Sequence, residues 1–427
     1  VFIIILAKPH VGLMALVAYR FLAGGLNLDN LFRGVGITAI KAIGLFTVVS
    51  FAALIIARKI QPYLGDRAQR TLLYTFVLVS LLSSFVAIEI RNVGTYLLQS
   101  FQNILLYFIF INLYAESKWL NRFAWVITAA LLATCLSGIL SAAVENVARA
   151  AGTMRNPNGL AMVANLTAAA FLVLLLASRD LRRRAVYVLG LVVAVATTFV
   201  TGSRGGLVAL VVTFTYQLTK GRRALAPYLV GIAVFAAVFS FIPEQYKMRQ
   251  VSWFSTLLGG NAEEATGGSR GFIYRSAWDI FKRSPIIGVG PRTFGTIYQA
   301  EYSFKSRGPA AHARSVHSGF LEVLVQMGVV GFAVFVALIV VTLVLYRKND
   351  NLCRRKGLGS YRLLNSLFEA LFIAVLASGA FETIIRLNSF FILLAAAAAI
   401  NRAAALLPAR PPVAAEDAAL PVPEAAA

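Results

Sequence analysis

Apolar runs of about twenty residues recur along almost the whole chain, and this feature limits the fold more than any other. A run of that length crosses the hydrocarbon core of a bilayer as one helix, because every backbone hydrogen bond must be made inside the segment. Composition agrees, since 59% of the 427 residues are hydrophobic and 14% are charged, whereas soluble domains average about 45–50% and about 25%. The sequence therefore predicts an all-α polytopic membrane protein.

The apolar runs predict about twelve transmembrane helices. Their expected ranges are Val1–Gly24, Gly36–Ala57, Thr71–Ile88, Tyr96–Tyr114, Phe123–Ala142, Gly159–Ala177, Ala185–Val200, Gly206–Thr219, Leu225–Ile242, His317–Tyr346, Leu363–Ile384 and Leu387–Leu407. The first run is interrupted by Lys8 and Pro9. We expect helices one to nine in residues 1–242, a large polar insert with short helices in 243–316, and helices ten to twelve in 317–407. The Ala/Pro-rich tail, 408–427, is predicted to be disordered.

Basic residues set the expected orientation. The net charge is +22, which in a soluble protein would indicate nucleic acid. Here the charge concentrates in alternate loops between apolar runs, at 58–70, 118–122, 179–184, 220–223 and 347–362. Such loops face the cytoplasm, so both termini are predicted to be cytoplasmic and the insert to face outward, into the periplasm of a Gram-negative cell. We expect no nucleic-acid partner.

Four polar segments fall together on the predicted outer face. They are GTMRNPNG (152–159), TGSRGG (201–206), Arg270 at the start of an amphipathic helix in the insert, and Arg314 with His317 where the chain re-enters the membrane. Each also has an ordinary structural explanation. An arginine in a tight turn often anchors a helix at the headgroups, and Asn-Pro is typical of turns.

Two further structural explanations apply on the same face. Arg275 and Asp279, four residues apart on a helix, are expected to pair. A histidine at the start of a helix is commonly an interfacial polar residue.

Together, these segments favour chemistry on a diphosphate. The planar guanidinium of arginine binds phosphate through two hydrogen bonds, and histidine titrates near neutral pH and can accept a proton from an attacking hydroxyl. The acidic residues noted on this face are scattered: Glu145, Glu244, Glu263, Glu264, Asp279 and Glu301. We therefore expect no metal and no cofactor, so that arginines would carry the charge of the leaving group.

Three segments carry a resemblance to a known family. GSRGG, then SRGFIYRSAWDIFKRSPIIGVGPRTF, then RSVHSGFLEVLVQMGVVGF resemble the signature of the O-antigen ligase and O-antigen polymerase superfamily. RNPNGLA is similar to a segment of its ligase-like members. The resemblance covers roughly Gly152 to Phe332, and the predicted number of helices agrees with the family over the whole chain.

The resemblance implies an inner-membrane glycosyltransferase of the GT-C type. Such proteins take a glycan from undecaprenyl diphosphate at the periplasmic face; ligases pass it to lipid A–core, and polymerases pass it to another lipid-linked unit. The essential positions carry over to Arg204, Arg270 and His317. Ser318 departs from the asparagine that often follows the histidine. Further residues expected to bind the diphosphate or the glycan are Arg314, Arg155, Arg292, Arg275 and Asn158.

The expected reaction is a single displacement at the anomeric carbon, which would invert its configuration. A ligase is favoured over a polymerase because of the RNPNG segment and the single late insert; a protein O-oligosaccharyltransferase is a third alternative. Gly288, Gly290 and Pro291 suggest that the insert forms a mobile lid. The alternative of another class is a transporter of lipid-linked glycans, which should carry charges deep in its helices. Few such charges are present, and Glu369 is expected near a helix end.

Overall fold

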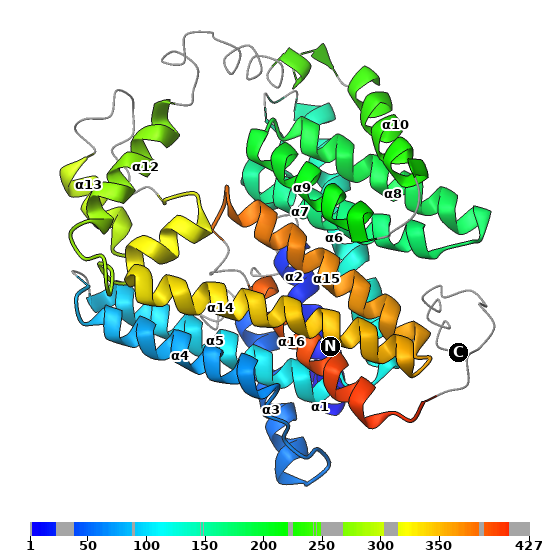
Figure 1. Cartoon of the computed structure of the whole chain (residues 1–427), viewed down its shortest axis with the longest axis horizontal. Helices are drawn as coiled ribbons and strands as arrows, with labels where there is room; N and C mark the ends of the chain where they lie inside the picture. The colour runs from blue at the N-terminus through cyan, green and yellow to red at the C-terminus, as the bar shows by residue number, and fades with distance from the viewer. Residues whose placement is uncertain are drawn as a thin grey trace.

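The computed structural model describes residues 2–22, 38–87, 90–145, 147, 149–220, 225–241, 243–244, 246–248, 268–302, 315–383 and 388–409. Every element in these ranges is helical (Figure 1). Eight of the described helices are long and apolar enough to cross a membrane, and shorter apolar helices occupy Pro9–Leu22 and Ile232–Phe241. The predicted class, an all-α polytopic membrane protein, is confirmed. The total of about twelve spans and the limits of the segments stay predictions.

The predicted apolar runs coincide with helices. The helices are α1 (Phe2–Ala7), α2 (Pro9–Leu22), α3 (Ala39–Ile56), α4 (Arg67–Ser84), α5 (Ile90–Leu113), α6 (Ser117–Glu145), the 3₁₀ turn η2 (Gly152–Met154), α7 (Pro157–Ala177), α8 (Leu181–Val200), α9 (Arg204–Lys220), α10 (Leu225–Phe241), α12 (Gly268–Phe281), α13 (Phe294–Glu301), α14 (Gly319–Arg355), α15 (Gly359–Gly379) and α16 (Asn388–Leu406). The first run is divided into α1 and α2 at Lys8, because Pro9 suits the first position of a new helix.

Helices α7, α15 and α16 form the centre of the described bundle. α7 is buried on nearly every side, as expected for a helix that is apolar all round. It packs against α6, α8, α9 and α15, whereas α16 packs against α5, α14 and α15. The long helix α14 crosses the molecule beside α4, and α12 and α13 lie at its N-terminal end (Figure 1).

The described part of the insert has a small apolar core of its own. Ile273 and Ile280 of α12 meet Phe294 and Tyr298 of α13, and Val325 of α14 completes the cluster. This part of the insert is therefore packed on the first turns of α14, next to the point where the chain re-enters the bundle.

Helix α14 is broken at Gly328, where φ is 65° and ψ is −170°. The PIIGVG loop (Pro285–Gly290) fits into the break and exchanges backbone hydrogen bonds with it. Val289 N donates to the Val325 carbonyl (3.0 Å), and Val329 N donates to the Pro285 carbonyl (2.8 Å). A Cβ at Gly288 would lie 2.3 Å from the backbone of α14, so only glycine allows the loop to approach the helix this closely. The predicted lid motion stays untested.

Several predictions fall outside the described residues. They include Arg307, Arg314 and most of the tail.

Candidate functional site

Two of the predicted polar segments meet in a hydrogen-bonded cluster at one end of the bundle. We call this the site end; it is where α7, α9 and α14 begin and where α8 and α15 end. Arg149 donates to the Thr201 carbonyl (3.0 Å) and to Asn158 Oδ1 (3.0 Å). Ser203 Oγ donates to the same Asn158 oxygen (3.1 Å). Asn158 thus joins the RNPNG segment to the SRGG turn, and its amide oxygen is used by the protein itself.

Arg204 is the first residue of α9, and the start of this helix is fixed by an N-cap hydrogen bond and by close packing of the two glycines that follow. Ser203 Oγ accepts a hydrogen bond from Gly206 N (3.2 Å), as in a helix N-cap. A Cβ at Gly205 would lie 2.6 Å from the Phe381 side chain, and one at Gly206 would lie 2.7 Å from the Cβ of Ala161. The two glycines allow α9 to approach the ends of α7 and α15. The half-buried Arg204 therefore lies at a helix N-terminus, where the partial positive charge favours anions.

His317 lies at the start of α14, close to the end of α15. Gly319 N donates to the Glu382 carbonyl (3.0 Å), and His317 Nδ1 is 3.3 Å from Ser315 Oγ. The backbone of His317 is left-handed, with φ 54°. That conformation is uncommon for a residue other than glycine and is found preferentially at functional sites. His317 itself is half-buried.

Arg270, in the first turn of α12, acts electrostatically on the same loop. Burial raises the pKa of the Glu382 carboxyl above its usual value; the nearby Glu322 raises it further, whereas Arg270 lowers it. Burial also raises the pKa of Tyr274, which Arg270 opposes. Arg270 and the segment around His317 thus approach Glu382 from different elements.

The other predicted binding residues are arranged differently. Arg155 is exposed in a left-handed turn, with φ 55°. Arg292 donates to Gln99 of α5 (2.8 Å), which ties the insert to the bundle. Arg275 is exposed on α12, and the expected pair with Asp279 is wrong, because Asp279 pairs with Lys282 (2.8 Å). Substrate roles for these arginines stay predictions.

Three charged residues of this region were missed as site candidates. Arg149 stands six residues before the RNPNG motif, in a loop that also carries Arg155. Glu322 follows His317 by five residues and is 3% exposed, and it accepts a hydrogen bond from Gln326 (3.1 Å). Glu382 lies two residues before the end of the predicted run Leu363–Ile384. A carboxylate near the end of an apolar run was the sequence signal that could have identified Glu382 as a site candidate.

The site combines arginines and one histidine with a buried carboxyl group, Glu322, and a half-buried one, Glu382. Among the residues that the structure describes, no three His, Cys, Asp or Glu side chains are grouped as a metal site requires. Metal independence stays a prediction.

A comparison with known families matches residues 189–336 to the model of the family described as O-antigen ligase. This range contains Arg204, Arg270 and His317. No curated protein matches the chain.

Proposed function

Residues 189–336 place the chain in the O-antigen ligase and polymerase superfamily, and from this membership we propose that it transfers a glycan from undecaprenyl diphosphate to a sugar hydroxyl of lipid A–core. The reaction takes place at the periplasmic face of a Gram-negative inner membrane, with both termini in the cytoplasm. One observation carries the proposal. The elements bearing Arg204, Arg270 and His317 converge on the loop after α15, through the contact of Gly205 with Phe381 and the interactions of Glu382.

Arg204 and Arg270 bind the diphosphate of the donor in this proposal. A guanidinium donates two parallel hydrogen bonds to phosphate oxygens, and two such groups neutralise the charge that grows as the diphosphate leaves. The N-terminus of α9 adds partial positive charge at Arg204. Glu382 attracts Arg270 electrostatically, which favours a position of the guanidinium at the site when no donor is bound.

His317 accepts the proton of the acceptor. The acceptor oxygen attacks the anomeric carbon, the bond from that carbon to the phosphate oxygen breaks, and its electron pair leaves with the diphosphate. With Nδ1 protonated toward Ser315 Oγ, Nε2 carries the lone pair that takes the proton. Attack from the face opposite the leaving group inverts the configuration.

The lipid tail of the donor lies in an apolar groove between α8, α9 and α10. The groove has a volume of about 220 Å³ and is lined by residues that include Val195, Leu210, Phe214 and Phe235. Leu210 follows Arg204 by six residues on α9, so the groove begins about 9 Å along the helix from the proposed diphosphate site. An isoprenoid chain that leaves Arg204 along α9 would enter it directly.

Reconstitution tests the proposal. Proteoliposomes with undecaprenyl diphosphate-linked glycan, lipid A–core and a chelator are assayed for the parent, His317→Asn and Arg270→Ala. Asparagine tolerates the left-handed backbone at 317 but supplies no base. Arg283→Ala is the matched control, since Arg283 is an exposed arginine of the insert that pairs with Glu301.

Glycosylated lipid A–core is expected from the parent and the control only. Lengthened lipid-linked glycan would instead indicate a polymerase, and a glycosylated acceptor protein would indicate a protein O-oligosaccharyltransferase. Movement of the donor across the bilayer without any product would indicate a transporter.

A further inference from the structure

Glu369 is a carboxylate buried in the middle of a membrane helix. It is 1% exposed and is the eleventh of the 21 residues of α15, so the expectation that it lies near a helix end is wrong. A buried carboxylate is costly unless it is paired and hydrogen-bonded, and charges inside membrane helices commonly have a specific task. Its partners therefore indicate why it is there.

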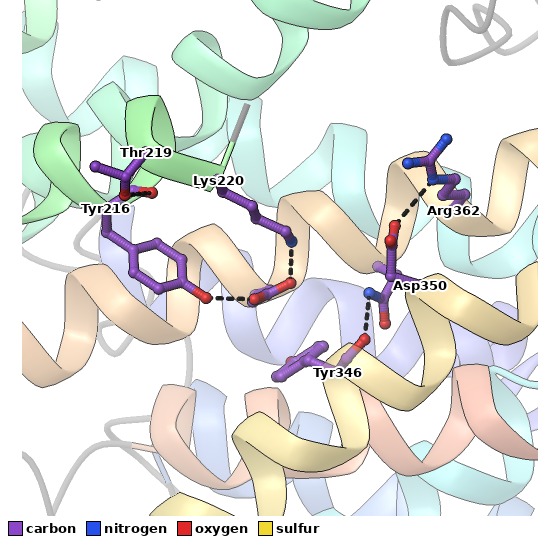
Figure 2. A network of polar contacts seen from close by, with 8 residues as sticks. Tyr216, Thr219, Lys220, Tyr346, Asp350 and Arg362 are labelled. Atoms are coloured by element: carbon purple, nitrogen blue, oxygen red, sulfur yellow. Dashed lines mark hydrogen bonds and ion pairs between the residues drawn. The ribbon is translucent and has the colours of Figure 1, made fainter. Parts of the chain in front are cut away.

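Both oxygens of this carboxylate are bound by one neighbouring helix. Tyr216 Oη donates to one oxygen of Glu369, and Lys220 Nζ donates to the other. Figure 2 shows the two side chains reaching from α9 to the same carboxylate on α15. Tyr216 and Lys220 are four residues apart, so they share one face of α9. The contact fixes that face toward α15.

The same face of α9 is fixed again at the site end. Gly205 and Tyr216 are eleven residues apart (216 − 205), which is about 16 Å and within about 20° of three full turns. Gly205 packs against Phe381, which follows α15. Two contacts with the α15 segment on one face determine both the axial position and the rotation of α9. A slip by one residue would move Arg204 by about 1.5 Å and turn it by about 100°.

An ionic contact suits this task inside a membrane. Apolar side chains gain no hydrophobic energy by leaving lipid for a neighbouring helix, so an apolar face specifies the register of two helices weakly. A hydrogen-bonded charge pair has one satisfied register, and displacement leaves a buried charge unpaired.

We propose that the Tyr216–Glu369–Lys220 contact is a register clamp, and that Glu369 is a positioning residue which sets Arg204 for diphosphate binding. The inference rests on the proposed function, in which Arg204 binds the donor. The clamp acts from the end of α9 opposite the site end.

Charge reversal tests the clamp. Steady-state kinetics in proteoliposomes are compared for the parent, Lys220→Glu, Glu369→Gln and the exchanged double variant Lys220→Glu/Glu369→Lys, with rates normalised to folded protein. Each single variant is expected to lower kcat by about 10- to 100-fold, the effect of a misplacement near 1 Å, with the KM for lipid A–core unchanged. The exchanged variant is expected to return to within about threefold of the parent.

A second readout does not depend on turnover. Inorganic pyrophosphate is expected to raise the melting temperature of the parent and of the exchanged variant, and not that of Lys220→Glu. Asp350→Asn is the matched control, because it removes the nearby Asp350–Arg362 pair (2.9 Å) between α14 and α15 without touching α9.

The outcomes separate the two proposals. If Arg204→Ala is inactive while Lys220→Glu and Glu369→Gln keep the kcat of the parent, the clamp is refuted and the proposed function stands. If Arg204→Ala is fully active, the proposed role of Arg204 in diphosphate binding is refuted, and the clamp proposal, which depends on it, is refuted as well. If the single variants do not fold, an exchanged variant that folds but stays inactive refutes the clamp.

Discussion

Replacing Gly328 by alanine tests whether the break in α14 is built to receive the PIIGVG loop. At φ 65° and ψ −170° the backbone is in a region adopted essentially by glycine alone, which costs another residue about 1–3 kcal/mol. A Cβ would also lie 2.2 Å from the Ile286 carbonyl oxygen and 2.3 Å from its carbon. Overlap of this kind in a packed site costs about 1–3 kcal/mol. The sum is about 2–6 kcal/mol.

Thermal unfolding of the purified protein in detergent measures this effect. With about 2.1 cal/mol/K per residue, the 427 residues give an unfolding entropy of roughly 0.9 kcal/mol/K, so the melting temperature is expected to fall by about 2–7 °C. Gly94→Ala is the matched control, since a Cβ there meets nothing within 4 Å, and alanine in a helix gains up to about 1 kcal/mol. A Gly328→Ala protein that melts as high as Gly94→Ala would refute the reasoning.

Three further changes have defined expectations. Burial raises the pKa of Glu382 above its usual 4.5, so its carboxyl group favours folding while protonated and opposes folding as the pH rises through the folded-state pKa. Glu382→Gln should therefore raise the melting temperature at pH 8 and leave it unchanged at pH 4. Arg149→Met loses two hydrogen bonds from a charged donor, each worth about 1.5–3 kcal/mol, so chemical denaturation should show a loss of about 3–6 kcal/mol. Arg283→Ala breaks an exposed pair with Glu301 and should cost at most about 1 kcal/mol without changing the transfer rate.

Each expectation has an outcome that contradicts it. A pH-independent effect at Glu382 would mean that its carboxyl group does not titrate differently on folding. An unchanged stability of Arg149→Met would mean that the cluster with Asn158 contributes nothing. A large loss of transfer in Arg283→Ala would place the exposed pair in the catalytic machinery.

Hydrophobic length was sufficient to predict where the helices form, but less so where they end. α14 continues nine residues beyond Tyr346, to Arg355, because the charged residues there remain good helix formers outside an apolar run. The break at Gly328 left no local signal, since a glycine among valines also suits a packed helix. Its cause is the PIIGVG loop, which is distant in sequence.

The candidate site was predictable only in part, because the sequence indicates which residues share a face but not which of them are buried. The distribution of basic loops predicted that the SRGG turn and His317 lie on one face of the membrane. In the structure, α9 and α14, which begin at these segments, both contact the loop after α15. The roles of Glu322, Glu382 and Arg149 depend on neighbours far along the chain. A sequence pattern shows that a charge is present, but whether it is buried is decided by packing.

The buried Glu369 also bears on the transporter alternative. Charges inside the helices are more frequent than the sequence indicated, because Glu369 and its partner Lys220 meet inside the described bundle. The carboxylate is satisfied by protein groups on both oxygens, which suits a fixed contact better than a site that must load and release a substrate.

The seating of the PIIGVG loop in α14 limits how this protein can be recombined with its relatives. The loop completes hydrogen bonds that the broken helix lacks, so the insert and the helix share one backbone network. A chimera that exchanges residues 268–302 alone would leave unmatched peptide groups on both sides of the junction. An exchanged insert should therefore fold in place only when it travels with residues 325–330.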